Sequence, residues 1–173
     1  MIATRRALRS RALFAVAWVV ATGCGGQEPA LRLPTPAELE GIYGPSVEVE
    51  LSGNVVDVRA VQPADQLRRG GSTWAKVGPY IYLFSPQTRD LFATYTGVAA
   101  VRVTTVDGRG RLVGRAILAR GALNSVTWKK AINLAGRARL EGTERPSYIL
   151  DLIEYGEETV EHEYGATYVR EDR

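Results

Sequence analysis

The stretch that decides the fold is VAAVRVTTVDGRGRLVGRAIL, residues 98–118. Two runs rich in valine and other strand-forming residues, 98–106 and 111–118, flank the tetrapeptide DGRG. Asp-Gly between two such runs is a strong signal for a β-hairpin. The stretch therefore predicts two paired antiparallel strands within the folded domain.

Further strands are predicted on the N-terminal side of this hairpin. Residues 47–51 alternate between apolar and acidic side chains, SGN at 52–54 supplies a turn, and 55–61 resumes a strand pattern. Residues 80–84, YIYLF, are apolar or aromatic on both faces, which is typical of a central strand that is covered on both sides. We therefore expect an antiparallel sheet of five or six strands between residues 46 and 119.

Helices are predicted around and after these strands. Ser85-Pro86 favours the start of a short helix at 86–95. Apolar residues then recur at spacings of three and four from 125 to 140, and again from Ile149 to Tyr164, which predicts two amphipathic helices. Gly156 falls in the middle of the second apolar face, which indicates a close approach to the first helix.

The predicted fold class is α+β. In this fold the antiparallel sheet carries a short inserted helix and a C-terminal helical hairpin that packs on the sheet. A β-sandwich with appended helices is the alternative.

The first residues have the pattern of an export signal. Four arginines without an acid precede an apolar run at 12–22, and small residues follow it. This order is typical of a secretory signal peptide. The run is too short to span a membrane, which takes about 20 apolar residues. We expect residues 1–23 to be a signal peptide that is removed.

The only cysteine lies directly after this signal. Ala21-Thr22-Gly23-Cys24 resembles the lipobox of bacterial lipoprotein precursors. The resemblance implies that Cys24 becomes the mature N-terminus and carries acyl chains, such as palmitate, that hold the protein on a membrane. The alternative is a free or buried cysteine in an N-terminal helix.

Two further resemblances concern export and location. Gly25, where some lipoproteins have aspartate, resembles the pattern that sorts Gram-negative lipoproteins to the outer membrane. We therefore expect the periplasmic face of the outer membrane, with the inner membrane as the alternative. Arg5-Arg6 within TRRALR resembles a twin-arginine export signal, so both the general secretory route and the twin-arginine route stay open.

The rest of the chain divides into a tether, one domain and a tail. Residues 24–40 are a polar, proline-containing spacer, within which Thr35-Pro36-Ala37-Glu38 predicts a capping box and a short helix that ends at Gly41. Residues 41–170 have the length of a single domain. Residues 171–173 are a tail.

The charge distribution argues against nucleic-acid binding. Four of the 22 basic residues precede Cys24 and all 19 acids follow it, so the mature formal charge is 18 minus 19, or −1. A nucleic-acid-binding domain needs a net basic surface. Segment 102–139 carries nine basic residues against one acid, and segment 140–173 carries ten acids against three arginines. We expect these segments to pair across the two C-terminal helices; docking onto neighbouring proteins is the alternative.

Few residues carry chemistry. No hydrolase, phosphate-binding or dinucleotide motif occurs, and the only histidine is His162. Glu154, Glu158 and His162 recur at four-residue spacing on the second predicted helix. They are weak candidates for a metal site and more typical of a solvated face, so no metal or cofactor is predicted.

Aromatic side chains are the remaining candidates for a binding site. Tyr80, Tyr82 and Phe84 share one face of their predicted strand and are candidates to stack against a sugar or a peptide. Trp74 and Trp128 are candidates of the same kind. The alternative for all five is a place in the core.

The sequence therefore predicts a lipid-anchored protein of the cell envelope. Its expected role is that of a non-catalytic accessory or protein-interaction subunit with an envelope protein as partner. A lipoprotein that binds a small ligand or a glycan is the alternative, and an enzyme that hydrolyses an envelope polymer is the third reading.

Overall fold

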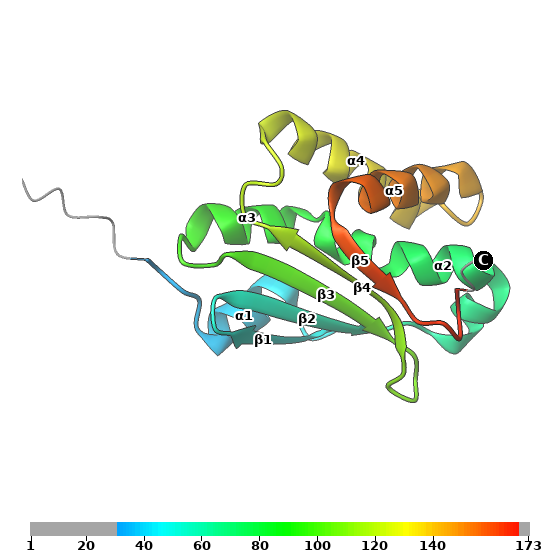
Figure 1. Ribbon diagram of the computed structural model, residues 1–173, viewed down its shortest axis with the longest axis horizontal. Coiled ribbons are helices and arrows are strands. Elements are labelled where there is room, and N and C mark those ends of the chain that lie inside the picture. The colour runs from blue at the N-terminus through cyan, green and yellow to red at the C-terminus, as the bar shows by residue number, and fades with distance from the viewer. Residues whose placement is uncertain (1–30, 170–173) are drawn as a thin grey trace, which may run out of the picture. The chain divides into compact units, whose positions relative to one another are not determined.

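The computed structural model describes residues 31–169, and Figure 1 shows their arrangement. The helices are α1 (Pro36–Tyr43), α2 (Ala64–Leu83), α3 (Pro86–Thr94), α4 (Ser125–Glu141) and α5 (Pro146–Thr159). The strands are β1 (Glu48–Ser52), β2 (Val55–Val61), β3 (Ala100–Val106), β4 (Leu112–Ala119) and β5 (Glu161–Tyr164). Within this part of the chain, no helix combines the length and the hydropathy that crossing a membrane requires. The predicted signal peptide, Cys24 and the tail lie outside the described residues.

The strands form one sheet in the order β1-β2-β3-β4-β5, which confirms the α+β class. Because the described strands make one sheet, the sandwich alternative is wrong. The two predicted hairpins are present as β1–β2 and β3–β4. However, β2 and β3 are parallel, so the sheet is mixed and not antiparallel throughout. Parallel neighbours need a crossover connection, which α2 and α3 provide here.

The crossover contains the segment that was predicted as a central strand. Residues 80–83 end α2, and Phe84 is its C-cap. Tyr80, Leu83 and Phe84 are fully buried, because α2 lies between the sheet and the two C-terminal helices (Figure 1). A helix that is covered on all sides is apolar all round. Over five residues this pattern cannot be distinguished from that of a buried strand.

The second predicted C-terminal helix is shorter than expected. It ends at Thr159, and Val160 has an extended backbone with φ −134° and ψ 153°. The following four residues form β5, antiparallel to β4. Val160 and Tyr164 fit the spacing of a helix, yet they also fit the two-residue period of a strand. Pairing with the edge of β4, which is far away in sequence, selects the strand.

The helices α4 and α5 pack against each other and against α2. The helix α2 therefore separates them from most of the sheet, on which we expected them to pack directly. Gly156 likewise contacts α2, although we expected it to contact the first C-terminal helix. A Cβ atom on Gly156 would lie 2.6 Å from ring carbons of Tyr80 on α2. The close approach that Gly156 permits is thus to α2 and not to the first C-terminal helix.

The basic residues of α4 do not form the expected ion pairs with the acids of α5. Among the described residues, only Arg115 and Glu163 form an ion pair between segments 102–139 and 140–173, with an N–O distance of 3.3 Å. Two α4 cations lie instead over aromatic rings of α5, a contact worth about 0.5–1 kcal/mol at exposed sites. These pairs are Lys130 with Tyr155 at 4.8 Å and Arg137 with Tyr148 at 5.7 Å from the ring centroid.

The capping box predicted at Thr35 is present. The Glu38 amide donates to Thr35 Oγ1 at 3.3 Å, and the Glu38 carboxylate accepts from the Thr35 amide at 2.8 Å. The helix α1 continues past Gly41 to Tyr43. Its Leu39 is fully buried in the main core, so α1 is part of the compact unit.

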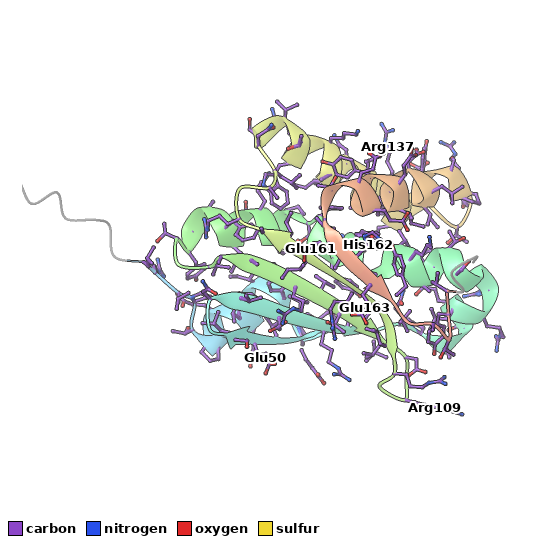
Figure 2. The ribbon with its side chains drawn as sticks, in the orientation of Figure 1. Glu50, Arg109, Arg137, Glu161, His162 and Glu163 are labelled. Atoms are coloured by element: carbon purple, nitrogen blue, oxygen red, sulfur yellow. The ribbon has the colours of Figure 1, made fainter. Side chains whose placement is uncertain are left out.

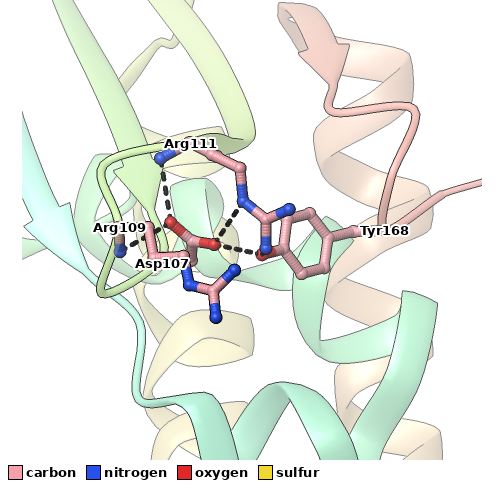
Figure 3. Close-up of polar contacts among 4 residues, drawn as sticks. All are labelled: Asp107, Arg109, Arg111 and Tyr168. Atoms are coloured by element: carbon pink, nitrogen blue, oxygen red, sulfur yellow. Dashed lines mark hydrogen bonds and ion pairs between the residues drawn. The ribbon is translucent and has the colours of Figure 1, made fainter.

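A buried carboxylate ties the C-terminal segment to the β3–β4 turn (Figure 3). Asp107 Oδ2 accepts from Tyr168 Oη at 2.6 Å and from Arg111 Nε at 2.8 Å, and Oδ1 accepts from the Arg109 and Arg111 amides. The hydrogen bond from Tyr168, together with those from Arg111 and Arg109, outweighs the effect of burial and lowers the pKa of Asp107 below its usual 3.8.

Gly156→Ala should lower the free energy of unfolding by about 1–3 kcal/mol, because the added methyl group overpacks the contact with Tyr80. Gly136→Ala on α4 is the matched control. A Cβ atom there meets nothing within 4 Å, and alanine in a helix is favoured over glycine by about 0.5–1 kcal/mol. Urea denaturation measures both variants. A Gly156→Ala variant as stable as Gly136→Ala would contradict the packing of α5 on Tyr80.

Asp107→Asn should destabilise the protein in a pH-dependent manner. A carboxylate whose pKa is lowered by folding stabilises the folded state above its unfolded pKa, and this contribution is lost as the pH falls toward the folded value. We therefore expect a lower urea midpoint than wild type at pH 7, and a difference that shrinks as the pH falls from 4 to 2. The exposed Asp90→Asn is the control. A difference that stays constant with pH would contradict the account.

Candidate functional site

A groove lies at the end of the sheet where β2 passes into α2. Its large lobe, of about 580 Å³, lies between the first turns of α2 and the α4–α5 loop. Its small lobe, of about 270 Å³, is lined by residues of α2, by the end of β2 and by Arg139 of α4. Pro63, Gln66 and Trp74 line both lobes. We call the two lobes together the Trp74 groove; ligand sites of proteins are commonly about 300–1,000 Å³.

Two glycines in α2 give the groove its shape. Gly71 has φ 55° and ψ −139°, which breaks α2 into two helical pieces. This backbone conformation is accessible to glycine and is strained for other residues. At Gly70 a Cβ atom would lie 1.3 Å from Cδ1 of Trp74. The indole of Trp74 therefore lies directly against the backbone of Gly70, half-buried between the two lobes.

Gln62 is the buried polar residue of the small lobe. Its amide donates to the Val106 carbonyl at 2.8 Å, which extends the β2–β3 ladder and fixes the backbone. Its side chain is buried, with the residue 5% exposed, and Nε2 donates to the Trp74 carbonyl at 2.9 Å. Only an N–H group can donate to that carbonyl, so the orientation of the side-chain amide is determined.

The amide oxygen of Gln62 has no hydrogen-bond partner within the described part of the protein. Among residues 31–169, Gln62 Oε1 is the buried side-chain polar atom that accepts no hydrogen bond. A buried acceptor without a donor destabilises a protein by about 1–3 kcal/mol, and such atoms are rare. Gly78 permits this arrangement, since a Cβ atom there would lie 2.4 Å from Gln62 Nε2. The groove therefore offers one buried acceptor to whatever enters it.

The charges of the groove are largely balanced. In the large lobe Asp65 and Arg69 form an ion pair at 2.8 Å. In the small lobe Arg139 donates to the Ile81 carbonyl at 2.8 Å and forms none of the ion pairs found among the described residues. The groove thus combines an aromatic ring, a buried acceptor and one cation.

The three aromatic residues predicted as a stacking face are not on one face. Two residues along a helix are about 200° apart, so Tyr82 points away from Tyr80 and Phe84. Tyr80 and Phe84 are buried in the core, where their rings stack at 6.0 Å. Tyr82 is half-buried and lines the small lobe. Of the tryptophans, Trp74 is central to the groove and Trp128 packs against Phe92 with ring centroids 6.4 Å apart.

A polar cluster holds β5 on α2 and α5. Tyr164 Oη is 2.7 Å from Tyr80 Oη and donates to Glu157 at 3.0 Å, and Lys76 donates to Glu157 at 2.9 Å. Burial raises the pKa of Tyr80 to about 12, and burial together with the bond to Tyr80 raises that of Tyr164. Burial alone would raise the pKa of Glu157, but hydrogen bonds from Lys76 and Tyr164 lower it. These tyrosines stay protonated at neutral pH, so the cluster is a structural tie.

The weak metal candidates do not share a helix face. Glu154 and Glu158 are exposed on α5, whereas His162 lies on β5 between Glu161 and Glu163 (Figure 2). The helix ends at Thr159, which removes the four-residue spacing on which the grouping depended. Across residues 31–169, no three His, Cys, Asp or Glu side chains form a group that could hold a metal ion.

The outer face of the sheet is charged and internally paired. Its charged side chains come from all five strands, and Figure 2 labels Glu50 of β1 and Glu163 of β5 among them. Three cross-strand ion pairs neutralise most of this charge. These pairs are Asp57–Arg102 at 2.9 Å, Arg115–Glu163 at 3.3 Å and Glu48–Arg59 at 3.7 Å.

No protein-family model, curated protein or solved structure matches this chain. A function can therefore be argued only from residues and geometry. The Trp74 groove is the strongest candidate, because it combines a concavity of ligand size with a buried unpaired acceptor. Sequence reasoning singled out Trp74 and Tyr82 but missed Gln62, whose burial depends on the β2–β3 pairing.

Gly70→Ala should displace the Trp74 indole from the groove. We expect a red-shifted fluorescence emission, because the ring moves into water. The measurement uses a chain in which Trp18 and Trp128 are replaced by Phe, so that Trp74 is the only tryptophan. Gly41→Ala, where a Cβ atom meets nothing within 4 Å, is the control. An unchanged emission maximum in Gly70→Ala would contradict the contact between the Trp74 indole and the Gly70 backbone.

Proposed function

We propose that this chain is a lipid-anchored, non-catalytic binding subunit of a bacterial cell envelope. Cys24 carries the acyl chains that hold it on the membrane, and Gly25 fits the pattern of outer-membrane sorting. The Trp74 groove is its binding site. The observation that carries the proposal is the buried, unpaired oxygen of Gln62 in a groove of ligand size.

The groove and the first described residues lie at opposite ends of β2, which supports this role. The chain enters the described domain beside α3, where the Arg32 carbonyl accepts from the Gly97 amide at 2.8 Å. This point is next to the start of β2, whereas Gln62 follows the end of β2. Seven strand residues separate the two ends by roughly 20 Å. The first described residues thus lie near one end of β2, and the groove lies at its other end.

The chemistry of the groove supports binding over catalysis. Its one carboxylate, Asp65, is paired with Arg69, and neither a histidine nor a cysteine lines either lobe. Acid–base catalysis needs a titratable side chain positioned at the reacting group, and nucleophilic catalysis needs a nucleophile that an adjacent base activates. The reading as an envelope-polymer hydrolase has no comparable support. Between a protein partner and a small ligand or glycan, the enclosed oxygen of Gln62 favours the ligand.

Anchoring is tested by Cys24→Ser in the full-length chain, expressed in a bacterial host and fractionated. We expect the wild-type chain in the membrane pellet, with acyl chains on the Cys24 peptide by mass spectrometry. Cys24→Ser should lose the acyl mass and leave the pellet. Gly25→Ala, which keeps the cysteine, is the matched control. An unmodified Cys24 peptide in a membrane-bound wild-type chain would contradict the proposal.

A further inference from the structure

We propose that the Trp74 groove binds a short glycan of acetamido sugars, with one sugar ring stacked on Trp74 and one acetamido group in the small lobe. This inference rests on the proposed function, because it names the ligand of the same groove. It follows from three features of the groove, which are the unpaired acceptor, the indole and the paired charges of the large lobe.

The small lobe matches the three parts of an acetamido group. Gln62 Oε1 needs a donor, which the acetamido N–H supplies. Arg139 lines the same lobe and offers guanidinium N–H groups to the acetamido carbonyl. Val61 and Ile81 form apolar walls for the methyl group. A plain hydroxyl would satisfy Gln62, but it would leave the apolar walls uncovered and would offer Arg139 no carbonyl oxygen besides that of Ile81.

The large lobe matches the rest of a sugar chain. A pyranose ring has an apolar face of C–H groups and a rim of hydroxyl groups. Trp74 offers an aromatic surface against which the apolar face can stack. It lies where the two lobes meet, so a ligand that fills both lobes crosses it. The polar residues that line the large lobe offer both donors and acceptors for the hydroxyl groups. These residues are Asp65, Gln66, Arg69, Thr73 and Thr143.

The charges of the large lobe favour a neutral ligand. Asp65 and Arg69 neutralise each other at 2.8 Å, so a charged ligand finds no unmatched opposite charge there. A purely apolar ligand, such as an acyl chain, would have to cover both charged groups and the oxygen of Gln62 without hydrogen-bonding them. Covering polar groups in this way is unfavourable. A neutral, polyhydroxylated chain avoids both penalties.

The test is titration calorimetry of the full-length lipidated chain in a detergent that has no sugar headgroup. The probes are tri-N-acetylchitotriose and cellotriose, which have the same linkage but differ in the acetamido groups. We expect saturable binding of the chitotriose and at least tenfold weaker binding of cellotriose. Equal affinities for the two sugars, or no binding of chitotriose by a chain with a wild-type melting curve, would overturn the inference.

Two variants assign the binding to the groove. Gln62→Met keeps the side-chain volume but removes both the acceptor and the Nε2 donor to the Trp74 carbonyl, so chitotriose binding should weaken by at least about tenfold. Its melting curve, compared with that of Gln87→Met, an exposed control on α3, shows whether the variant is folded at the temperature of the titration. Trp74→Ala should abolish binding, whereas Trp128→Phe, outside the groove, should not change it. Wild-type affinity in Gln62→Met would overturn the role of Gln62.

The two proposals fail separately. If chitotriose does not bind while Cys24 is acylated and the chain stays in the membrane pellet, the ligand class is wrong and the anchoring stands. If chitotriose binds and is lost in Gln62→Met while Cys24 carries no lipid, the groove assignment stands and the anchoring is wrong.

Discussion

The parallel pairing of β2 with β3 is the constraint on which the rest of the structure depends. Parallel neighbours cannot be joined by a tight turn, so the chain must cross over one face of the sheet. The helix α2 makes this crossing and is in turn covered by α4 and α5. Its buried side chains, Tyr80, Leu83 and Phe84, contribute to the same core as the inward residues of the sheet. Each fully buried side chain of this size is worth about 1.5–3 kcal/mol, so α2 holds the layers together.

The same crossover builds the candidate site. The ladder between β2 and β3 continues for one residue past β2 and fixes Gln62, and Pro63 then begins the turn into α2. The break at Gly71 bends α2 and places Trp74 beside Gln62, whose Nε2 bonds the Trp74 carbonyl. Gln62 Oε1 is buried here without a hydrogen-bond donor from the described part of the protein, although an apolar side chain of similar size would avoid this cost. Such departures from good packing are commonly found at functional sites.

Much of the fold could be predicted from local signals, and the failures share one cause. Both hairpins, the capping box at Thr35 and the helix after Ser85 depend on residues close together in sequence, and all are present. Residues 80–84 and 160–164 were misassigned because their patterns fit a helix and a strand equally well. In both cases contacts with a segment far away in sequence determine the secondary structure. Residues 80–84 are covered by α4 and α5, and residues 161–164 pair with the edge of β4. Gln62 was missed for the same reason, since a polar residue after a strand gives no local sign of burial.

The most direct test of the central claim is a nitrogen-15 NMR titration of the full-length chain in detergent with tri-N-acetylchitotriose. The account predicts that the side-chain NH₂ signals of Gln62 and the indole N–H of Trp74 shift together with one dissociation constant, while the indole of Trp128 does not move. Shifts confined to residues outside the Trp74 groove, or no shifts at saturating sugar, would contradict the claim that this groove is the binding site.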